Sequence, residues 1–326
     1  MSLNEFDIIT TYFKRPAKHS SVIQSVGDDC AVLSVPETQQ LVVSMDTLVA
    51  GKHFPNNTRP EHIAQRAFCT CLSDLAAMGA VPYCFTLGLT LPESDTLWLQ
   101  SFSESLLSIA DKYQCDLVGG DTTQGPLSIT IQVHGLVKAG AALTRGAAQA
   151  GDKVFVTGCL GDGAAALAVL LNPAINIDTA AQKYLLQRFY CPEPQIKSGC
   201  LLVDYANAAI DISDGLLADC QHIATASAVD IEIDATKIPL SPACRAVASE
   251  HAFDKALVGG DDYQLVFTVP EKHYASVNLF IEDNILDATE IGQVLNSLST
   301  APAVRCLNDQ QVVAIAAKQG YQHFAS

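Results

Sequence analysis

The alternation of apolar and polar positions predicts strands that alternate with helices along the whole chain. Apolar residues recur at helical spacing from Glu61 to Met78, and Gly79 ends the run. A second helix is expected to begin after a cap at Ser94 or Asp95 and to run to Tyr113. Short apolar or alternating runs predict strands at residues 41–45, 81–91 and 127–137.

The second half repeats this alternation after an Ala- and Gly-rich segment at residues 140–151. Strands are expected at residues 153–157, 209–212, 229–233 and 263–269, and helices near 179–190, 194–206 and 214–227. A chain of 326 residues exceeds the usual size of one hydrophobic core. We therefore expect two domains, an N-terminal one at residues 1–140 and a C-terminal one at residues 151–326.

Aspartates recur directly after these apolar runs, several of them beside glycine. The strand at residues 41–45 is expected to deliver Asp46 at its end, before a loop at 47–53. The clusters are Gly27-Asp28-Asp29, Ser44-Met45-Asp46, Leu72-Ser73-Asp74, Gly119-Gly120-Asp121, Asp211-Ile212-Ser213-Asp214 and Gly259-Gly260-Asp261-Asp262. Carboxylates with a backbone N–H cradle suit a hard cation such as Mg²⁺ bound together with substrate phosphates.

Ordinary turn chemistry is the alternative for each cluster taken alone, because Asp bonds its own downstream backbone and Gly supplies positive φ. Six clusters in one chain are harder to explain in this way. Asp74 is also expected near the C-terminal end of its helix, where a negative charge opposes the helix dipole. That unfavourable position favours a ligand role for Asp74.

Composition and charge exclude several classes of binding partner. The 49% hydrophobic and 17% charged residues indicate a folded globular protein, and the formal charge of −16 disfavours binding to nucleic acid. No apolar run approaches the ~20 residues that cross a bilayer, so no membrane contact and a cytoplasmic location are expected. The 11 cysteines include no Cys-x-x-Cys pair and are expected to be structural thiols.

Two familiar nucleotide motifs, the P-loop and the protein-kinase loops, do not occur in the sequence. Gly161-Asp162-Gly163-Ala164-Ala165-Ala166 matches the glycine pattern of dinucleotide-binding folds, at the expected point between a strand and a helix. Asn172-Pro173 and a polar stretch follow where that fold requires a second strand. Close helix–strand packing explains the glycines equally well.

Seven segments in this order resemble the thiamine-monophosphate kinases. They are Asp28–Ala31, Ser44–Phe54, Leu72–Ala80, Gly119–Thr123, Leu143–Arg145, Asp211–Leu216 and Gly320–Phe324. The resemblance implies an α/β (α+β) chain with the two-domain fold of aminoimidazole-ribonucleotide-synthetase-like proteins. It further implies an N-terminal mixed sheet with helices that binds ATP and metal, a C-terminal α/β domain, and a homodimer in which the N-terminal sheets pack together.

The resemblance also implies roles for individual residues. The Mg²⁺-binding set would be Asp29, Ser44, Asp46, Asp74, Asp121, Asp211 and Asp214, with Met45 contributing through its backbone if at all. Gly120, Asp121, Arg145 and Ser213 match ATP contacts, and His53, Asp261 and Tyr321 match substrate contacts. The chain departs from the family at Asp261, where glutamate is usual, at Gln264 within the same motif, and at Met45, where threonine is common.

The activity that this resemblance implies is ATP-dependent phosphorylation of thiamine monophosphate to thiamine diphosphate, with several Mg²⁺ ions. The phosphoryl group would pass directly to an ionised substrate oxygen, which needs neither a covalent nucleophile nor a protein base. Two rival functions remain open. One is a related synthetase that activates a carbonyl or selenide with ATP, and the other is a non-catalytic metal- or nucleotide-binding regulator.

Overall fold

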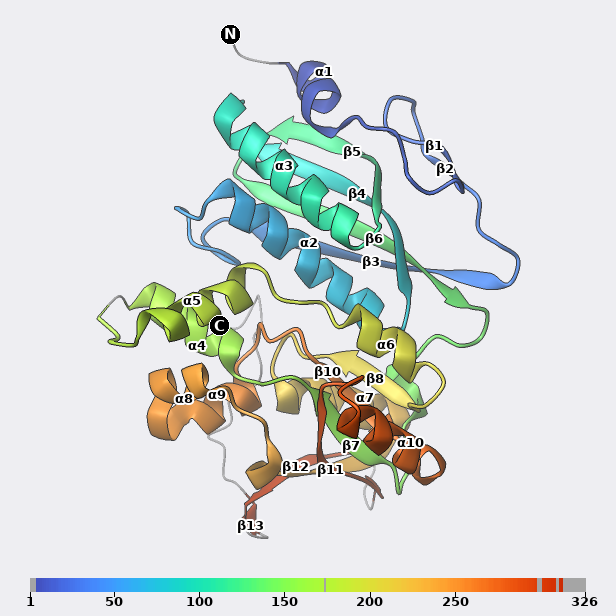
Figure 1. Cartoon of the computed structure of the whole chain (residues 1–326), viewed down its shortest axis with the longest axis vertical. Helices are drawn as coiled ribbons and strands as arrows, with labels where there is room; N and C mark the ends of the chain where they lie inside the picture. Colours follow the sequence, from blue (N-terminus) through green and yellow to red (C-terminus); the bar gives the residue numbers. More distant parts are fainter. Residues whose placement is uncertain (1–3, 173, 298–300, 309–310, 313–326) are drawn as a thin grey trace. The chain divides into compact units, whose positions relative to one another are not determined.

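The computed structural model describes residues 4–172, 174–297, 301–308 and 311–312 (Figure 1). The chain divides into two compact units. One unit contains the residues up to Leu75 together with Ala80–Ala141, and the other contains Ala76–Gly79 together with the residues from Ala142 onward. The C-terminal residues Tyr321 and Phe324, which the sequence analysis singles out, lie outside the described residues.

The first unit is built on a four-stranded mixed sheet in the order β3-β6-β4-β5. Its strands are β3 (Gln39–Val49), β4 (Val81–Leu91), β5 (Asp116–Gln124) and β6 (Ser128–Lys138). β6 pairs antiparallel with β3 and β4, whereas β4 and β5 are parallel. Helices α2 (Pro60–Ala77) and α3 (Thr96–Lys112) cover one face of this sheet (Figure 1). Short elements precede it: α1 (Glu5–Ile8), the π-helix η1 (Ile9–Phe13), β1 (Val22–Gln24) and β2 (Val32–Leu33).

Side-chain alternation explains why one face of this sheet carries the helices. Along β6, Ile129, Ile131 and Val133 are buried and the residues between them are partly exposed. Phe68 and Leu72 of α2 are also fully buried. Each such side chain contributes about 1.5–3 kcal/mol by leaving water. The predicted half-buried strand at residues 127–137 and the helices at 61–78 and 94–113 are therefore confirmed, with ends shifted by one or two residues.

Two local predictions in this unit are wrong. β3 does not stop before Asp46 but continues to Val49, because β6 pairs with it residue by residue from Lys138 to Ser128. Gly119-Gly120-Asp121 is not a turn either. It lies within β5, which follows β4 in parallel as far as Gln124. In both cases the neighbouring strand extends a segment whose own sequence suggests a loop.

The second unit contains a seven-stranded sheet in the order β13-β12-β9-β11-β7-β10-β8. The strands are β7 (Lys153–Thr157), β8 (Ala208–Asp211), β9 (Val229–Asp234), β10 (Leu265–Val269), β11 (Ala288–Asn296), β12 (Val304–Asn308) and β13 (Gln311–Val312). All neighbours are antiparallel except β12 and β9, which are parallel.

Helices pack on both faces of this sheet, which is why β7 and β10 carry buried apolar side chains on both faces. Val154 and Val156 of β7 join the larger core, and Phe155 points to the opposite face, where it stacks on Phe267. The helices are α4 (Asp162–Leu171), α5 (Thr179–Tyr190), α6 (Ile196–Leu202), α7 (Leu216–Ser227), α8 (Pro242–Ala248), α9 (Ala252–Val258) and α10 (Glu271–Glu282), with short 3-10 turns η2 (Arg145–Ala147), η3 (Ala235–Lys237) and η4 (Ser249–His251).

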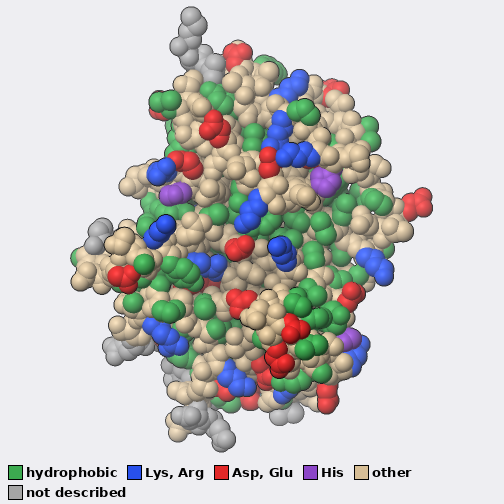
Figure 2. Space-filling model, viewed as in Figure 1, with side chains coloured by type: hydrophobic (Ala, Val, Ile, Leu, Met, Phe, Trp, Pro, Cys, Tyr) green, Lys and Arg blue, Asp and Glu red, His purple; other side chains and the backbone are tan. Residues whose placement is uncertain are grey.

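On the face of the molecule shown in Figure 2, Lys and Arg side chains are interspersed with Asp and Glu. Among the helices that the structure describes, none is both long enough and apolar enough to span a bilayer.

Candidate functional site

A pair of carboxylates faces a hydroxyl between β3 and α2 of the first unit. Ser44 and Asp46 are two residues apart on one strand, so their side chains share a face. Asp74 approaches this face from the last turn of α2, and the Ser44 hydroxyl donates a hydrogen bond to its Oδ2 atom. The structure thus brings together three of the residues that the resemblance assigns to Mg²⁺.

The electrostatics of this pair favour a bound cation. Burial, and then the charge of Asp74, raises the pKa of Asp46 from its ordinary value of 3.8 to about 6. The negative charge on Asp46 is therefore disfavoured when nothing positive is near. All donor atoms are oxygens, which is the ligand type that Mg²⁺ prefers. The residues present consequently fit a magnesium ion.

Met45 and His53 occupy different surroundings. The Met45 side chain is 58% exposed and points away from Ser44 and Asp46, since alternate residues of a strand face opposite sides. His53 follows β3, and its Nδ1 atom accepts a hydrogen bond from the backbone N–H of Val49 at 2.9 Å. Because a backbone N–H can only donate, the proton of the neutral ring lies on Nε2. His53 is therefore set up as an Nε2–H donor, as an anion contact requires.

A second group lines a cavity of about 540 Å³ in the same unit. Gly27-Asp28-Asp29 lies on one side of it and Gly119-Gly120-Asp121 on another, with Lys14 also in its wall. Gly120 has φ of +153°, and a Cβ atom there would lie 2.0 Å from the Leu87 carbonyl oxygen. Only glycine fits this contact between β5 and β4. The cavity thus combines two candidate metal ligands with one cationic side chain.

The two groups of the first unit are separate within one chain. Asp46 pairs with Ile131, Ile131 with Leu87, and Leu87 with Gly120, so a single row of residues crosses all four strands. Three strand spacings place Asp46 about 14 Å from Gly120. One ion cannot bind Asp46 and Asp121 of the same chain over this distance.

Two adjoining loops of the second unit carry the remaining described candidates, apart from Arg145. Asp211 ends β8, and Ser213 and Asp214 follow before α7. The loop of residues 259–264 runs alongside, because the N–H groups of Asp261 and Tyr263 donate to the carbonyl oxygens of Ser213 and Ile212 at 3.0 and 2.8 Å. The structure thus brings Asp211, Ser213, Asp214 and Asp261 together.

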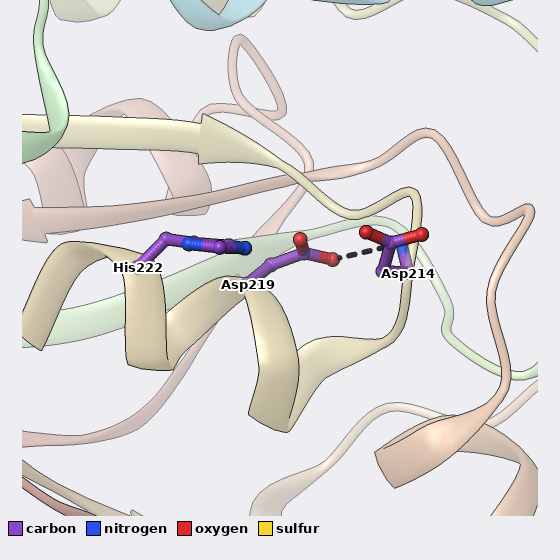
Figure 3. Close-up of side chains that lie close together, drawn as sticks. All are labelled: Asp214, Asp219 and His222. Atoms are coloured by element: carbon purple, nitrogen blue, oxygen red, sulfur yellow. Dashed lines mark hydrogen bonds between the residues drawn. The ribbon is translucent and has the colours of Figure 1, made fainter. Parts of the chain in front are cut away.

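Asp219, which the sequence analysis does not select, holds one of these loops in place. Its Oδ2 atom accepts the N–H groups of Ser213, Asp214 and Gly215, each at 3.1 Å. Figure 3 shows Asp219 and His222 directed from α7 toward Asp214, and the ligand atoms of the three residues lie within 4.8 Å of one another. Burial, followed by the charge of Asp214, raises the pKa of Asp219 to about 7. The sequence signal that could have identified Asp219 is an acidic residue in the first turn of a helix that follows Ser213-Asp214-Gly215.

The dinucleotide alternative is not supported by the turn before α4. Its Gly161 and Gly163 N–H groups donate to the carboxylate of buried Asp262 at 2.7 and 3.0 Å. A residue of the protein itself therefore occupies the position where a pyrophosphate would bind. The elements after α4 are α5 and α6, and a dinucleotide fold would continue with a strand.

Arg145 lies in η2 of the second unit with an exposed side chain, and its carbonyl oxygen accepts a hydrogen bond from Ser227 at 2.8 Å. Its side chain is thus accessible to a ligand. Tyr321 lies outside the described residues, so its substrate role stays a prediction.

Comparison with known proteins identifies the class first. Residues 27–137 match the family described as AIR synthase related protein, N-terminal domain, and residues 149–304 match the corresponding C-terminal domain. The two-domain fold is that of an AIR-synthase-related protein, which confirms the predicted fold class.

Close relatives then identify the particular family. Thiamine-monophosphate kinase of Escherichia coli strain K12 is 44% identical over 328 residues, which cover 100% of each chain. The crystal structure of thiamine-monophosphate kinase from Stenotrophomonas maltophilia K279a is 40% identical, with a TM-score of 0.85 over 94% of this chain and 97% of the other. A structure of AaThiL complexed with AMPPCP and TMP is 32% identical, with a TM-score of 0.78 over 92% of each chain. The chain belongs to the thiamine-monophosphate kinase family.

Proposed function

We propose that this protein transfers the γ-phosphoryl group of ATP to thiamine monophosphate and forms thiamine diphosphate. The observation that carries the proposal is the half-buried pair Asp46 and Asp74, in a chain that belongs to this kinase family. Such a pair needs a cation, and phosphoryl transfer is the chemistry that a carboxylate-bound cation assists. The relative complexed with AMPPCP and TMP supports ATP as the donor and thiamine monophosphate as the acceptor.

Mg²⁺ is the cation that we assign to these carboxylates. Ser44, Asp46 and Asp74 would hold it in one group, Asp29 and Asp121 in a second, and Asp211 and Asp214 in a third. Mg²⁺ held by these carboxylates would supply positive charge that offsets the negative charge of the phosphate oxygens. Following the family resemblance, we assign Gly120, Asp121 and Ser213 to ATP. Gly120 and Asp121 line the cavity of the first unit, and Ser213 lies in the loop before α7 of the second unit.

The chain's own cationic and N–H groups orient the phosphates. His53 donates through Nε2 to the phosphate of thiamine monophosphate, and Arg145 offers a fixed positive charge to ATP. The attacking oxygen of the substrate is already ionised at neutral pH, so direct transfer needs no protein base.

Incubation with γ-labelled ATP alone should leave the protein unlabelled. Stoichiometric label that chases into thiamine diphosphate would contradict direct transfer.

A homodimer is part of the proposal. Leu41, Val43 and Met45 form an exposed apolar stripe on the edge strand β3, with exposed fractions of 39%, 48% and 58%. Such a stripe favours burial against another chain. A dimer in which β3 of one protomer lies beside β5 of its partner would also place Asp46 close to the partner's Asp121. Within one chain, Gly120, which precedes Asp121, lies about 14 Å from Asp46. We place this dimer in the cytoplasm, where ATP is available.

One assay tests the function against its rivals. Purified protein with ATP, Mg²⁺ and thiamine monophosphate should yield thiamine diphosphate and ADP in equal amounts. Thiamine should be a poor acceptor, because it lacks both the nucleophilic oxygen and the phosphate that orients it. Nucleotide binding without product would favour the regulator, and ADP formation only with another acceptor would favour a related synthetase.

A further inference from the structure

The loop of residues 259–264 contains two left-handed residues that are not glycine. Asp261 has φ of +70° and Tyr263 has φ of +51°, and the buried Asp262 lies between them. Side chains with a Cβ atom resist this conformation, because the Cβ atom crowds the backbone. Strain of this kind persists where the surrounding structure enforces it, and it is concentrated at functional sites.

Asp262 is the residue that enforces the loop conformation. Its two carboxylate oxygens accept the N–H groups of Gly161 and Gly163, and its carbonyl oxygen accepts a hydrogen bond from Arg188 at 3.2 Å. The loop packs closely against the start of α4, because a Cβ atom on Gly163 would lie 2.4 Å from the carbonyl oxygen of Asp261. The loop is therefore fixed to the start of α4 on one side and to the Ser213 turn on the other.

The fixed loop determines where the Asp261 carboxylate points. The Tyr263 hydroxyl donates to Asp261 Oδ1 at 2.9 Å, across the buried residue between them. Asp261 is one methylene shorter than the glutamate usual in this family. A shorter side chain has fewer rotatable bonds, so its reach depends more on the backbone that carries it. Asp262 sets that backbone and Tyr263 sets the side-chain direction.

We propose that Asp262 and Tyr263 are positioning residues that hold the Asp261 carboxylate toward the cationic heterocycle of the acceptor. The inference rests on the proposed function, since it assigns this carboxylate to thiamine monophosphate and not to ATP. A thiazolium ring with an aminopyrimidine N–H group is the kind of partner that a fixed, partly buried carboxylate recognises. A substrate without positive charge or an N–H donor at that point gains nothing from it.

Tyr263→Phe tests the inference, because it removes one hydroxyl and leaves the ring in place. The KM for thiamine monophosphate should rise about tenfold, which corresponds to losing one hydrogen bond to a charged group. The KM for ATP and kcat should change less than about twofold. Titration calorimetry should show the same loss for thiamine monophosphate binding without turnover. The matched control is Tyr274→Phe, since the Tyr274 hydroxyl donates to Glu290 at 2.6 Å elsewhere in the same unit.

A double-mutant cycle separates positioning from general stabilisation. Asp261→Ala should weaken thiamine monophosphate binding, and adding Tyr263→Phe to it should weaken binding no further. The inference is overturned if Tyr263→Phe leaves the KM for thiamine monophosphate unchanged, if it raises both KM values equally, or if Asp261→Ala has no effect. A wild-type protein that forms no thiamine diphosphate would instead overturn the proposed function itself.

Discussion

At the scale of single residues, the negative charge of Asp46 costs the folded protein least when a cation is bound. Its pKa of about 6 lies above the ordinary value of 3.8, so the folded state favours the protonated form. The stability that protonation provides is present at pH values below 3.8 and is lost as pH rises through about 6. Near pH 8 the metal-free protein therefore carries the full cost of the charge, which a bound cation would offset.

Asp46→Asn should separate catalysis from stability. Without metal at pH 8 the variant should melt about 2–4 °C higher than the wild type, because a repulsive charge is gone. Turnover with Mg²⁺ should fall by at least about 100-fold. The thermal shift on adding Mg²⁺ should also shrink. Differential scanning calorimetry and a coupled ADP assay measure these effects.

Glu104→Gln is the control for that variant, because it removes an exposed carboxylate of α3 in the same unit. It should change neither turnover nor the metal-induced shift. Normal, metal-independent turnover in Asp46→Asn would show that Asp46 is a structural strand residue only.

The tautomer of His53 gives a second prediction at this scale. Glutamine carries an amide N–H group at about the distance of Nε2, whereas asparagine reaches only as far as Nδ1. His53→Gln should therefore retain most of the affinity for thiamine monophosphate, and His53→Asn should lose about tenfold. Calorimetric titration of both variants checks this order. The reverse order, or equal affinity, would argue against a phosphate contact through Nε2.

At the scale of elements, Asp262 links the loop before β10 to the start of α4. Burial raises its pKa from 3.8 to about 7 despite two N–H donors, so its charged form is disfavoured in the folded state. A raised carboxylate pKa means that stability from this group is present below about pH 4 and lost as pH rises through about 7. Asp262 therefore holds the strained loop of residues 259–264 in place, and its own contribution to stability depends on pH.

Asp262→Asn should reveal this dependence. The amide cannot titrate, so the melting temperature of the wild type minus that of the variant should decrease from pH 5 to pH 8. The control Asp283→Asn, at the exposed end of α10, should show a constant difference across this range. A difference for Asp262→Asn that increases with pH would mean that the charged carboxylate stabilises the fold.

Hydrophobic periodicity in the sequence is sufficient to predict elements that are stabilised mainly by contacts between residues close in sequence. The helix expected near 179–190 is α5, with both ends as predicted. β3 and β5 were misjudged around Asp46 and Gly119 because pairing with β6 and β4 overrides the local polar character. The sequence does not single out Asp219, and it places Asp262 among the candidate cation-binding clusters, although both residues act by accepting N–H groups. Such contacts leave little trace in side-chain patterns. The resemblance supplied candidate residues, but grouping them required the strand register.

At the scale of the whole molecule, the separation of Asp46 from Asp121 predicts how mutants combine. Asp46→Asn and Asp121→Asn homodimers should each be inactive. If each site takes Asp46 from one protomer and Asp121 from its partner, a heterodimer of the two mutants has one intact site and one doubly altered site. Co-expression with two different tags and tandem purification should give heterodimers with about half the wild-type activity. Inactive heterodimers would place both residues in the site of a single chain.

The edge position of β3 has a consequence for how the protein is made. This 11-residue strand ends the sheet, and its sequence contains no lysine, arginine or proline. Those residues normally discourage unwanted pairing at sheet edges. In the homodimer that we propose, a second copy covers this edge, and a newly synthesised chain displays it unpaired until that copy binds. If the proposed dimer forms there, correct association and aggregation compete for that edge, and the yield of active protein then depends on how quickly two newly synthesised chains meet.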